Sequence, residues 1–449
     1  MKKLIAVLLA LGLLALMGCG KAKESEATTA EPTTTAEATT TTAALLPTTA
    51  FPSLISTAQG KKISLPAHAN NGGSYVYHNG ATYFRQYNAD CFEGIGEWGI
   101  PRERHENTSK KMMRIDSDGI QTVFDDDGTD GIFIDSKGNF YLNRFKNEDG
   151  DYGYEAYSFD PKGKLRWTAD NNVGKIFALD ETRGLLICEG RSMYSSKEVY
   201  AINSITGMAT LLATSESKVE SVYYDSENGW LYYRDFAVDA PEICIKRVDW
   251  QGKEAKKITA IPMSLLLADS FPDEVDIYPP SWVKINHAYK SQGGLQFYFE
   301  IYNGNAQHFI DRKLVHVNAD GACSAIKNIT PSSMFGLFSP FNETNIQYII
   351  SDDVPNDYRV CTEYGSKGTV IFSQEEMASI GFPDPYYTRE VSRVIRDVAY
   401  AGKDVWFTAA TGFRDDEYYR SGNQGYKIAN VHVYRKSGIT GRIELVYEF

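Results

Sequence analysis

The sequence predicts an all-β fold, a β-propeller of four-stranded blades, on three observations. Residues 131–169 hold four short strand-like segments, joined in pairs by turns at 135–139 and 160–164. In each turn an Asp can bind backbone amides two residues on, and a Gly can supply the positive φ of a tight hairpin. The chain is rich in Tyr (29) and Phe (22), which favour strands. The unit recurs about every forty residues, the period of propeller blades.

The internal match is clearest across the second, third and fourth units. Each has an apolar pair followed by Asp135, Asp180 or Asp225, then a Gly within a few residues, then another apolar segment. This order predicts the first hairpin of a blade. We favour seven blades, with six or eight as the alternatives, at residues 73–126, 131–169, 173–214, 219–261, 282–330, 335–375 and 391–449.

Several stretches interrupt the blade pattern. Blade one contains an insertion at 87–109, and an irregular stretch at 262–281 precedes blade five. Residues 374–380 predict one or two helical turns. Residues 382–387 contain two Pro, which remove backbone donors and disfavour helix, so they predict a loop. Residues 61–65 predict an outer strand that pairs with the last blade, since an open ring would leave edge strands bare.

The first residues predict export. Two Lys precede a short apolar run at 4–16, which is typical of a secretory signal and short for a membrane span. Leu16-Met-Gly-Cys19 resembles a bacterial lipobox. The resemblance implies cleavage before Cys19 and attachment of lipid, such as palmitate, to Cys19. It therefore implies a lipoprotein held in the bilayer by buried acyl chains and exposed on the extracytoplasmic face of the cell membrane.

The chain then divides into three predicted parts: a signal peptide at 1–18, the lipidated Cys and a tether at 19–58, and one propeller domain at 59–449. The tether is rich in Thr, Ala and Glu and of low complexity. Such a segment buries too little apolar area to offset its ordering entropy, so we expect it to be disordered. The net charge of −12 argues against a nucleic-acid partner, because phosphate binding needs basic patches. We expect a monomer.

The repeated strand-Asp-x-x-Gly-strand units, with Tyr-rich strands, resemble the bacterial propellers of the NHL, TolB-like and YWTD groups. The resemblance covers most of residues 60–449, although no Tyr-Trp-Thr-Asp sequence occurs; the nearest are Leu231-Tyr-Tyr-Arg-Asp235 and Val405-Trp-Phe-Thr408. It implies a lipoprotein propeller that binds partners or serves as a scaffold.

Aromatic residues in the interrupting segments are the best indication of binding. Loops on a rigid scaffold commonly carry function, and aromatic rings anchor protein partners or stack on sugars. The alternative is that the rings pack against their own loops. The candidate ligand-binding residues are Tyr278, Trp282, Tyr386, Tyr387, Tyr418 and Tyr419.

The acidic run at 125–130 is the candidate metal site. Asp125, Asp127 and Asp130 could supply oxygen ligands to Ca²⁺, the one cofactor considered, although Ser136 stands where an EF-hand loop would have its Glu. The alternative is a connection between two blades. The histidines, including His316 and His432, form no ligand motif.

The remaining cysteines show no CxxC motif or disulfide framework. Those in apolar strands are expected to act as small buried hydrophobes. The sequence leaves undecided whether one or two disulfide bridges form among Cys91, Cys188, Cys244, Cys323 and Cys361. No nucleophile elbow or phosphate-binding glycine loop occurs, and no catalytic residue is assigned. The sequence therefore predicts a membrane-anchored binding or scaffold propeller for a protein partner or envelope glycan. The alternative is a polysaccharide lyase or hydrolase with its site at the channel mouth.

Overall fold

The computed structural model divides the chain into two units, Met1–Pro52 and Ser53–Phe449. Everything described below lies in the second unit. The described residues are 57–86, 92–95, 101–103, 110–148, 151–170, 172–192, 196–236, 242–253, 255–267, 283–291, 293–302, 309–328, 337–338, 348–351, 358–361, 369–381, 391–414 and 426–448. Among them, no helix has the length and apolar character needed to cross a bilayer.

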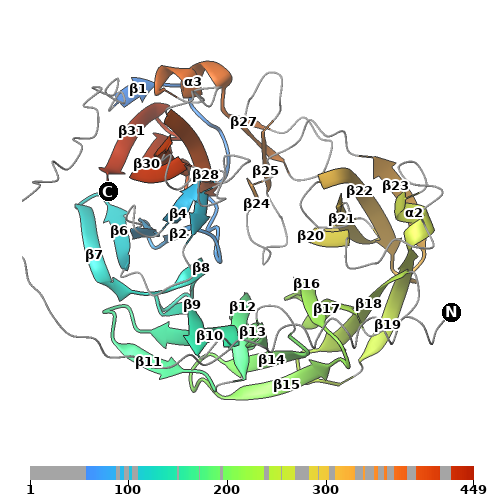
Figure 1. Cartoon of the computed structure of the whole chain (residues 1–449). Helices are drawn as coiled ribbons and strands as arrows, with labels where there is room; N and C mark the ends of the chain where they lie inside the picture. Colours follow the sequence, from blue (N-terminus) through green and yellow to red (C-terminus); the bar gives the residue numbers. More distant parts are fainter. Residues whose placement is uncertain are drawn as a thin grey trace, which may run out of the picture. The chain divides into compact units, whose positions relative to one another are not determined.

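Seven antiparallel sheets in the described residues make up a β-propeller, and they follow one another around a ring in sequence order (Figure 1). The prediction of seven blades is confirmed. Blade one contains β2 (Tyr75–His78), β3 (Ala81–Gln86), β6 (Lys110–Asp116) and β7 (Gly119–Asp126). Blade two contains β8 (Thr129–Ile134), β9 (Phe140–Glu148), β10 (Asp151–Phe159) and β11 (Leu165–Thr168).

The next three blades repeat this order. Blade three contains β12 (Val173–Asp180), β13 (Leu185–Gly190), β14 (Glu198–Asn203) and β15 (Ala209–Thr214). Blade four contains β16 (Val219–Asp225), β17 (Trp230–Asp235), β18 (Glu242–Asp249) and β19 (Lys256–Pro262), followed by the short helix α2 (Met263–Leu267). Blade five contains β20 (Val283–Ser291), β21 (Gly294–Tyr302), β22 (Phe309–Asn318) and β23 (Cys323–Asn328).

Blade six has the shortest strands: β24 (Leu337–Phe338), β25 (Tyr348–Ser351), β26 (Tyr358–Cys361) and β27 (Thr369–Phe372). The expected helical turn follows it as α3 (Gln374–Ser379), which begins with a capping box between Ser373 and Glu376. Blade seven contains β28 (Val391–Ala401), β29 (Asp404–Arg414), β30 (Tyr426–Ser437) and β31 (Arg442–Glu448).

The turns inside blade two fold as the sequence predicts. Asp135 Oδ1 accepts hydrogen bonds from the amides of Lys137 and Asn139, at 3.0 and 2.8 Å. Asp160 Oδ1 accepts the same pair of bonds from Lys162 and Lys164, both at 2.9 Å. The carboxylate of each Asp thus closes a turn locally, before any contact between blades is needed.

The hydrophobic core lies between neighbouring blades. Val76 and Met112 of blade one pack with Ile132 and Phe140 of blade two, and equivalent clusters fill other seams of the ring. At the closing seam, Trp406 of blade seven is buried and stacks on Tyr75 of blade one, with ring centroids 5.7 Å apart. Each sheet therefore gains stability from its neighbours rather than from a core of its own.

The ring is closed by the strand β1 (Thr57–Gln59), which pairs with β31 as an additional outer strand of blade seven. The prediction that an N-terminal strand pairs with the last blade is confirmed, but its location at 61–65 is wrong. The chain leaves the ladder at Gly60, where an added Cβ would lie 2.4 Å from Glu376 Oε1. Beyond Gly60, the amide of Ile63 donates to Gly438 O at 2.9 Å, in the last turn of the chain.

A buried ion pair secures this closure. Lys436 Nζ of β30 lies 2.7 Å from Glu376 Oε2 of α3 and also donates to Ile371 O. The same Glu376 accepts from the amide of Lys61. Burial lowers the pKa of Lys436, and its hydrogen bond to Glu376 opposes that shift. Blade six, blade seven and the N-terminal segment thus meet at one carboxylate.

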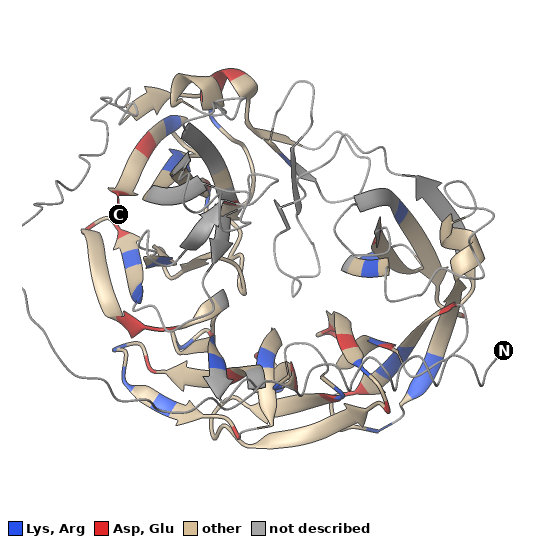
Figure 2. Ribbon diagram, viewed as in Figure 1, with Lys and Arg blue, Asp and Glu red and all other residues tan. Residues whose placement is uncertain are grey.

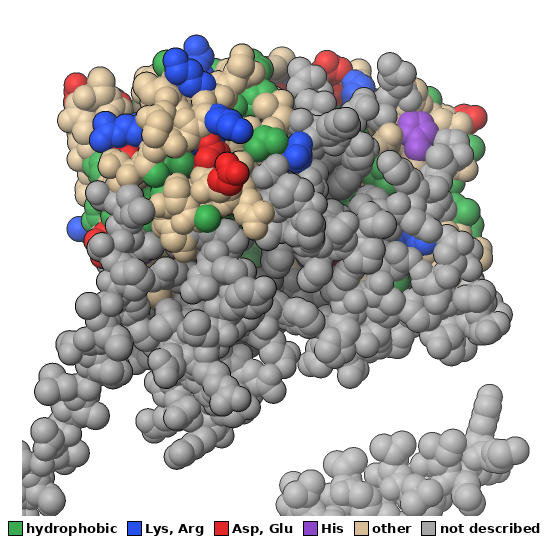
Figure 3. Space-filling model, turned by 90° about the horizontal axis from the view of Figure 1, so that it is seen from above, with side chains coloured by type: hydrophobic (Ala, Val, Ile, Leu, Met, Phe, Trp, Pro, Cys, Tyr) green, Lys and Arg blue, Asp and Glu red, His purple; other side chains and the backbone are tan. Residues whose placement is uncertain are grey.

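Among the described residues, Lys and Arg as well as Asp and Glu occur in the sequence of blades around the ring (Figure 2). In the space-filling view, described Lys and Arg side chains lie interspersed with Asp, Glu and hydrophobic side chains (Figure 3). Among the described residues visible on that face, acidic side chains are therefore mixed with basic and apolar ones.

Candidate functional site

The antiparallel order gives the ring two faces with different connections. We call the end of the blades that carries the turns between first and second strands, and between third and fourth strands, the turn face. The opposite end carries the connections between second and third strands and those from one blade to the next, and we call it the crossover face. Blade two illustrates both: the turns at 135–139 and 160–164 lie on the turn face, and Asp127–Gly128 crosses from blade one on the other.

The six aromatic candidates fall outside the described residues, but the strands that flank them are described. Residues 278 and 282 precede the first residue of β20, and residues 386 and 387 precede the first residue of β28. Residues 418 and 419 lie between the end of β29 and the start of β30. All these strand ends are at the crossover face, because first strands begin there and second strands end there.

The crossover face carries a further element that the sequence reasoning missed. The insertion of blade one forms a hairpin of β4 (Phe92–Ile95) and β5 (Pro101–Glu103). Ile95 of this hairpin pairs with Tyr426, the first residue of β30 in blade seven. The insertion therefore links the crossover connections of the first and last blades. The period of the blades gave no signal for it, because Gly94 and Pro101 interrupt any strand alternation.

The acidic run predicted as a metal site is a connection between blades one and two in the structure. Asp125 and Asp126 are the last residues of β7, Asp127 and Gly128 form the crossing, and Asp130 lies in β8. Asp125 is exposed and Asp127 Oδ2 lies 3.4 Å from Arg144 Nη1. The side chain of Asp130 is outside the described part of the chain.

The carboxylate at the centre of this run belongs to Asp126, which the sequence reasoning did not select. Asp126 Oδ2 accepts from Arg85 Nε at 2.7 Å. Its Oδ1 accepts from the hydroxyl of Tyr157 at 2.6 Å and from the amide of Gly128 at 2.8 Å. We call Arg85, Asp126, Gly128 and Tyr157 the Asp126 cluster. It joins β3 and β7 of blade one to β10 of blade two.

Burial decides what the Asp126 cluster can do. The side chains of Arg85 and Asp126 are 2% and 0% exposed. Burial, followed by the nearby charge of Asp126, raises the pKa of Tyr157 well above its ordinary value, so Tyr157 remains a hydrogen-bond donor at neutral pH. Groups closed off from water in this way bind blades together and have no access to a substrate. The cluster is therefore a structural support beneath the crossover face.

A second layer of charges surrounds the cluster on its blade-two side. Arg144 and Lys146 both pair with Glu155, with Lys146 Nζ at 2.6 Å from Oε1. The Arg144 guanidinium also lies over the ring of Tyr157, at 5.3 Å from its centroid. Of these two half-exposed cations, Arg144 also pairs with Asp127, so that this carboxylate of the acidic run is engaged in an ion pair. Among the described side chains, no group of three or more His, Cys, Asp or Glu is arranged to hold a metal ion.

Cys188, Cys244 and His432 are buried in strands. Cys188 and Cys244 are buried free thiols, and burial raises the pKa of both, which makes them unreactive. Cys323 is half-buried and free; the side chains of Cys91 and Cys361 are outside the described part. His432 is buried in β30 with Nε2 3.3 Å from Glu448 Oε1.

No protein-family model matches this chain, and no curated protein matches it. Among solved structures it is similar to a protein from Agrobacterium tumefaciens described as a TolB, with 15% identity over 49% of this chain and 75% of that chain, and a TM-score of 0.31. It is also similar to the β-propeller domain of the Trilobed protease from Pyrococcus furiosus, with 10% identity over 69% and 93% of the two chains and a TM-score of 0.36.

A puromycin hydrolase is a third similar structure, with 11% identity and a TM-score of 0.41. The match covers 87% of this chain and 57% of the hydrolase, so this chain spans little more than half of that enzyme. Because these identities and TM-scores are low, the propeller fold is established by the sheets of this chain and not by the similar structures.

Proposed function

We propose that this chain is an extracytoplasmic binding or scaffold propeller. It is anchored in the cell membrane through lipid on Cys19, and it recognises a protein partner or an envelope glycan with its crossover face. One observation carries the proposal: the strand ends that flank all three aromatic segments are on this face. The described strand ends of blades five and seven that bound these three segments thus lie on one side of the ring rather than on both.

The architecture beneath that face supports the same assignment. The Asp126 cluster fixes blades one and two just below their crossing, and the β4–β5 hairpin ties blade one to blade seven. Loops held on a rigid scaffold lose less entropy when they bind, so they make good recognition surfaces.

The first test is affinity capture. The chain from residue 53 onward, the compact unit of the fold, would be immobilised and exposed to detergent extract and cell-wall fragments of the source organism. Mass spectrometry would identify bound peptides and sugars. One enriched envelope protein or an intact glycan supports the proposal. A shortened glycan would favour the alternative, a polysaccharide-cleaving enzyme, and an empty eluate would overturn both.

Variants then locate the binding surface. Replacing Trp282, Tyr386 and Tyr387 together by Ala should weaken binding of the captured partner about tenfold or more, because buried aromatic anchors dominate interface energies. The matched control is on the turn face, where Ile205 and Met208 are 67% and 70% exposed. Changing both to Ser removes exposed apolar surface of similar kind and should leave affinity unchanged. Equal effects from the two variants would exclude the crossover face as the binding surface.

The anchor has a separate test. Cys19→Ser should move the protein from the membrane fraction to the soluble fraction and abolish labelling with radioactive palmitate, because an acyl chain provides the bilayer affinity. A variant that stays in the membrane fraction would contradict the lipoprotein assignment and would leave the recognition test unaffected.

A further inference from the structure

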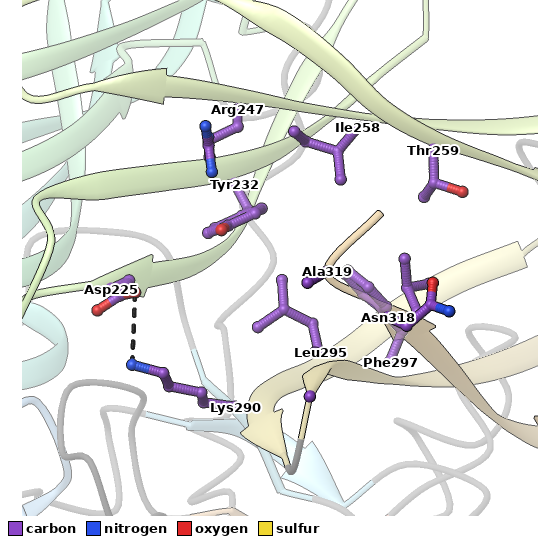
Figure 4. Close-up of a pocket in the computed structure, with 13 residues that line it drawn as sticks. Asp225, Tyr232, Arg247, Ile258, Thr259, Lys290, Leu295, Phe297, Asn318 and Ala319 are labelled. Carbon is purple, nitrogen blue, oxygen red and sulfur yellow. Dashed lines mark ion pairs between the residues drawn. The ribbon is translucent and has the colours of Figure 1, made fainter. Parts of the chain in front are cut away.

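A cavity of about 330 Å³ opens between blades four and five at the turn face. Blade four contributes strand residues that include Tyr232 and Arg247, and blade five contributes the two turns around Gly293 and Asn318. The close-up shows these side chains on opposite walls (Figure 4). The cavity is at the opposite ends of the strands from the aromatic segments, so it is separate from the proposed recognition face.

Arg247 is the cation that this cavity offers to a ligand. Its guanidinium stacks on the indole of Trp230, at 3.7 Å from the ring centroid. Within the described part of the chain its side chain has no carboxylate and no hydrogen-bond partner, and its Nε is buried. A guanidinium held flat on an aromatic ring keeps its donors fixed in one plane, which suits bidentate binding of a carboxylate.

The other cation of the cavity is already engaged. Lys290 Nζ lies 2.7 Å from Glu227 Oε2 and 3.7 Å from Asp225 Oδ2, and Figure 4 marks the pair with Asp225. The charged side chains that line the cavity are Arg247, Lys290 and Asp225, whose formal charges sum to +1; Glu227, which pairs with Lys290, is not among the lining residues. Arg247 is the lining cation that has no carboxylate partner among the described residues. A singly charged anion matches that charge. A phosphate dianion would need a second cation and would meet the negative Asp225.

The remaining walls are largely apolar, with polar groups of Tyr232, Thr259 and Asn318 among the other lining residues. Leu295, Phe297 and Val317 of blade five are buried and line the cavity. Asn318, also in the lining, has a buried Oδ1 that accepts no hydrogen bond from the described residues. The volume is at the lower end of the range for small-molecule sites. Arg247 and the largely apolar walls define a ligand with a negatively charged end and a hydrophobic body.

We propose that the cavity between blades four and five binds a small monocarboxylate with an apolar or aromatic body. The carboxylate pairs with Arg247, and the body packs against Leu295 and Phe297. The site is independent of the crossover face, so it would operate whichever partner that face binds.

Phenylacetate is a suitable probe, and its uncharged isostere phenylacetamide is the control ligand. Isothermal titration calorimetry on the unmodified protein should give phenylacetate a Kd of about 1 mM or tighter and phenylacetamide a Kd at least about tenfold weaker. Equal affinities, or no heat from either ligand, would overturn the proposal. This comparison requires no variant, so it holds even if a substitution impairs folding.

Variants then assign the charge. Arg247→Gln should weaken phenylacetate binding about tenfold or more, and Arg247→Lys should retain part of the affinity but lose the bidentate geometry. Lys256→Gln is the matched control, since Lys256 pairs with Arg247 in the strand register but does not line the cavity. A loss of affinity in Lys256→Gln equal to that in Arg247→Gln would show general electrostatic attraction and contradict the site.

Discussion

The turn face and the crossover face differ in how their connections between strands are stabilised. On the turn face a few residues close each described hairpin, and a carboxylate such as Asp249 binds amides of its own turn, at 3.1 and 2.6 Å. On the crossover face the connections range from the two residues at 127–128 to the 23 residues at 87–109, between β3 and β6. The stabilising contacts there join residues from different blades, as in the Asp126 cluster.

The comparison teaches where the chain can vary. A turn that is closed by its own side chain is stable locally and is repeated because each blade needs it. A connection that depends on another blade has no such local requirement, so length and sequence are free to change once the blades are fixed. Binding residues belong on the second kind of connection.

The largest expected effect tests the crossover face. Asp126→Ala should lower the free energy of unfolding by about 3–5 kcal/mol, because it leaves the buried charge of Arg85 without the carboxylate that faces it. Asp127→Ala, one residue on, removes an ion pair whose carboxylate is 39% exposed, and it should cost less than about 1 kcal/mol. Urea denaturation of both variants measures the difference. Similar losses of unfolding free energy in the two variants would mean that the buried Asp126 cluster does not stabilise the contact between blades one and two.

The next effect tests how the turn face packs on neighbouring blades. Gly163 has a φ of 77°, and a Cβ on it would lie 2.5 Å from Cβ of Phe124 in blade one. Gly80 has a similar φ of 83°, and an added Cβ would meet nothing within 4 Å. Gly80→Ala should therefore cost only the backbone strain, about 1–2 kcal/mol, whereas Gly163→Ala should cost about 2–4 kcal/mol. Thermal unfolding measures the loss of stability in each variant. Equal losses would show that the turn of blade two does not pack tightly against blade one.

The turn face was predictable from the sequence because the residues that determine each turn are close together in the chain. Asp160 and Gly163, for example, define one turn and thereby predict a strand on either side of it. The seven blades follow from repeating that signal. The closing strand was placed a few residues too late because Ile63 and Leu65 are apolar like a strand, yet they pack against blades six and seven from an irregular segment.

The candidate site was less predictable because its determinants are distant in the sequence. Arg85 and Asp126 are 41 positions apart, and Asp126 and Tyr157 are 31 apart, so their meeting depends on the blade register. In the sequence, Asp126 is one of three consecutive acidic residues, and nothing marks it as the buried one. The pairing of Trp230 with Arg247 beside the cavity is likewise a property of the β17–β18 register.

The smallest expected effect is a pH dependence on the turn face. Hydrogen bonds from the amides of Lys164 and Lys162 lower the pKa of Asp160 against a weaker opposing effect of desolvation. Since the folded pKa is below the unfolded value, this carboxylate stabilises the fold fully above the unfolded pKa, and the contribution is lost as the pH falls through the folded pKa.

Asp160→Asn keeps an oxygen acceptor but does not titrate. The stability gap between wild type and Asp160→Asn should thus be largest at neutral pH and should close as the pH falls through the folded pKa of Asp160. A gap that is constant with pH would mean that the ionised form of Asp160 is not what closes the turn, and that the turn face depends on Gly and backbone geometry alone.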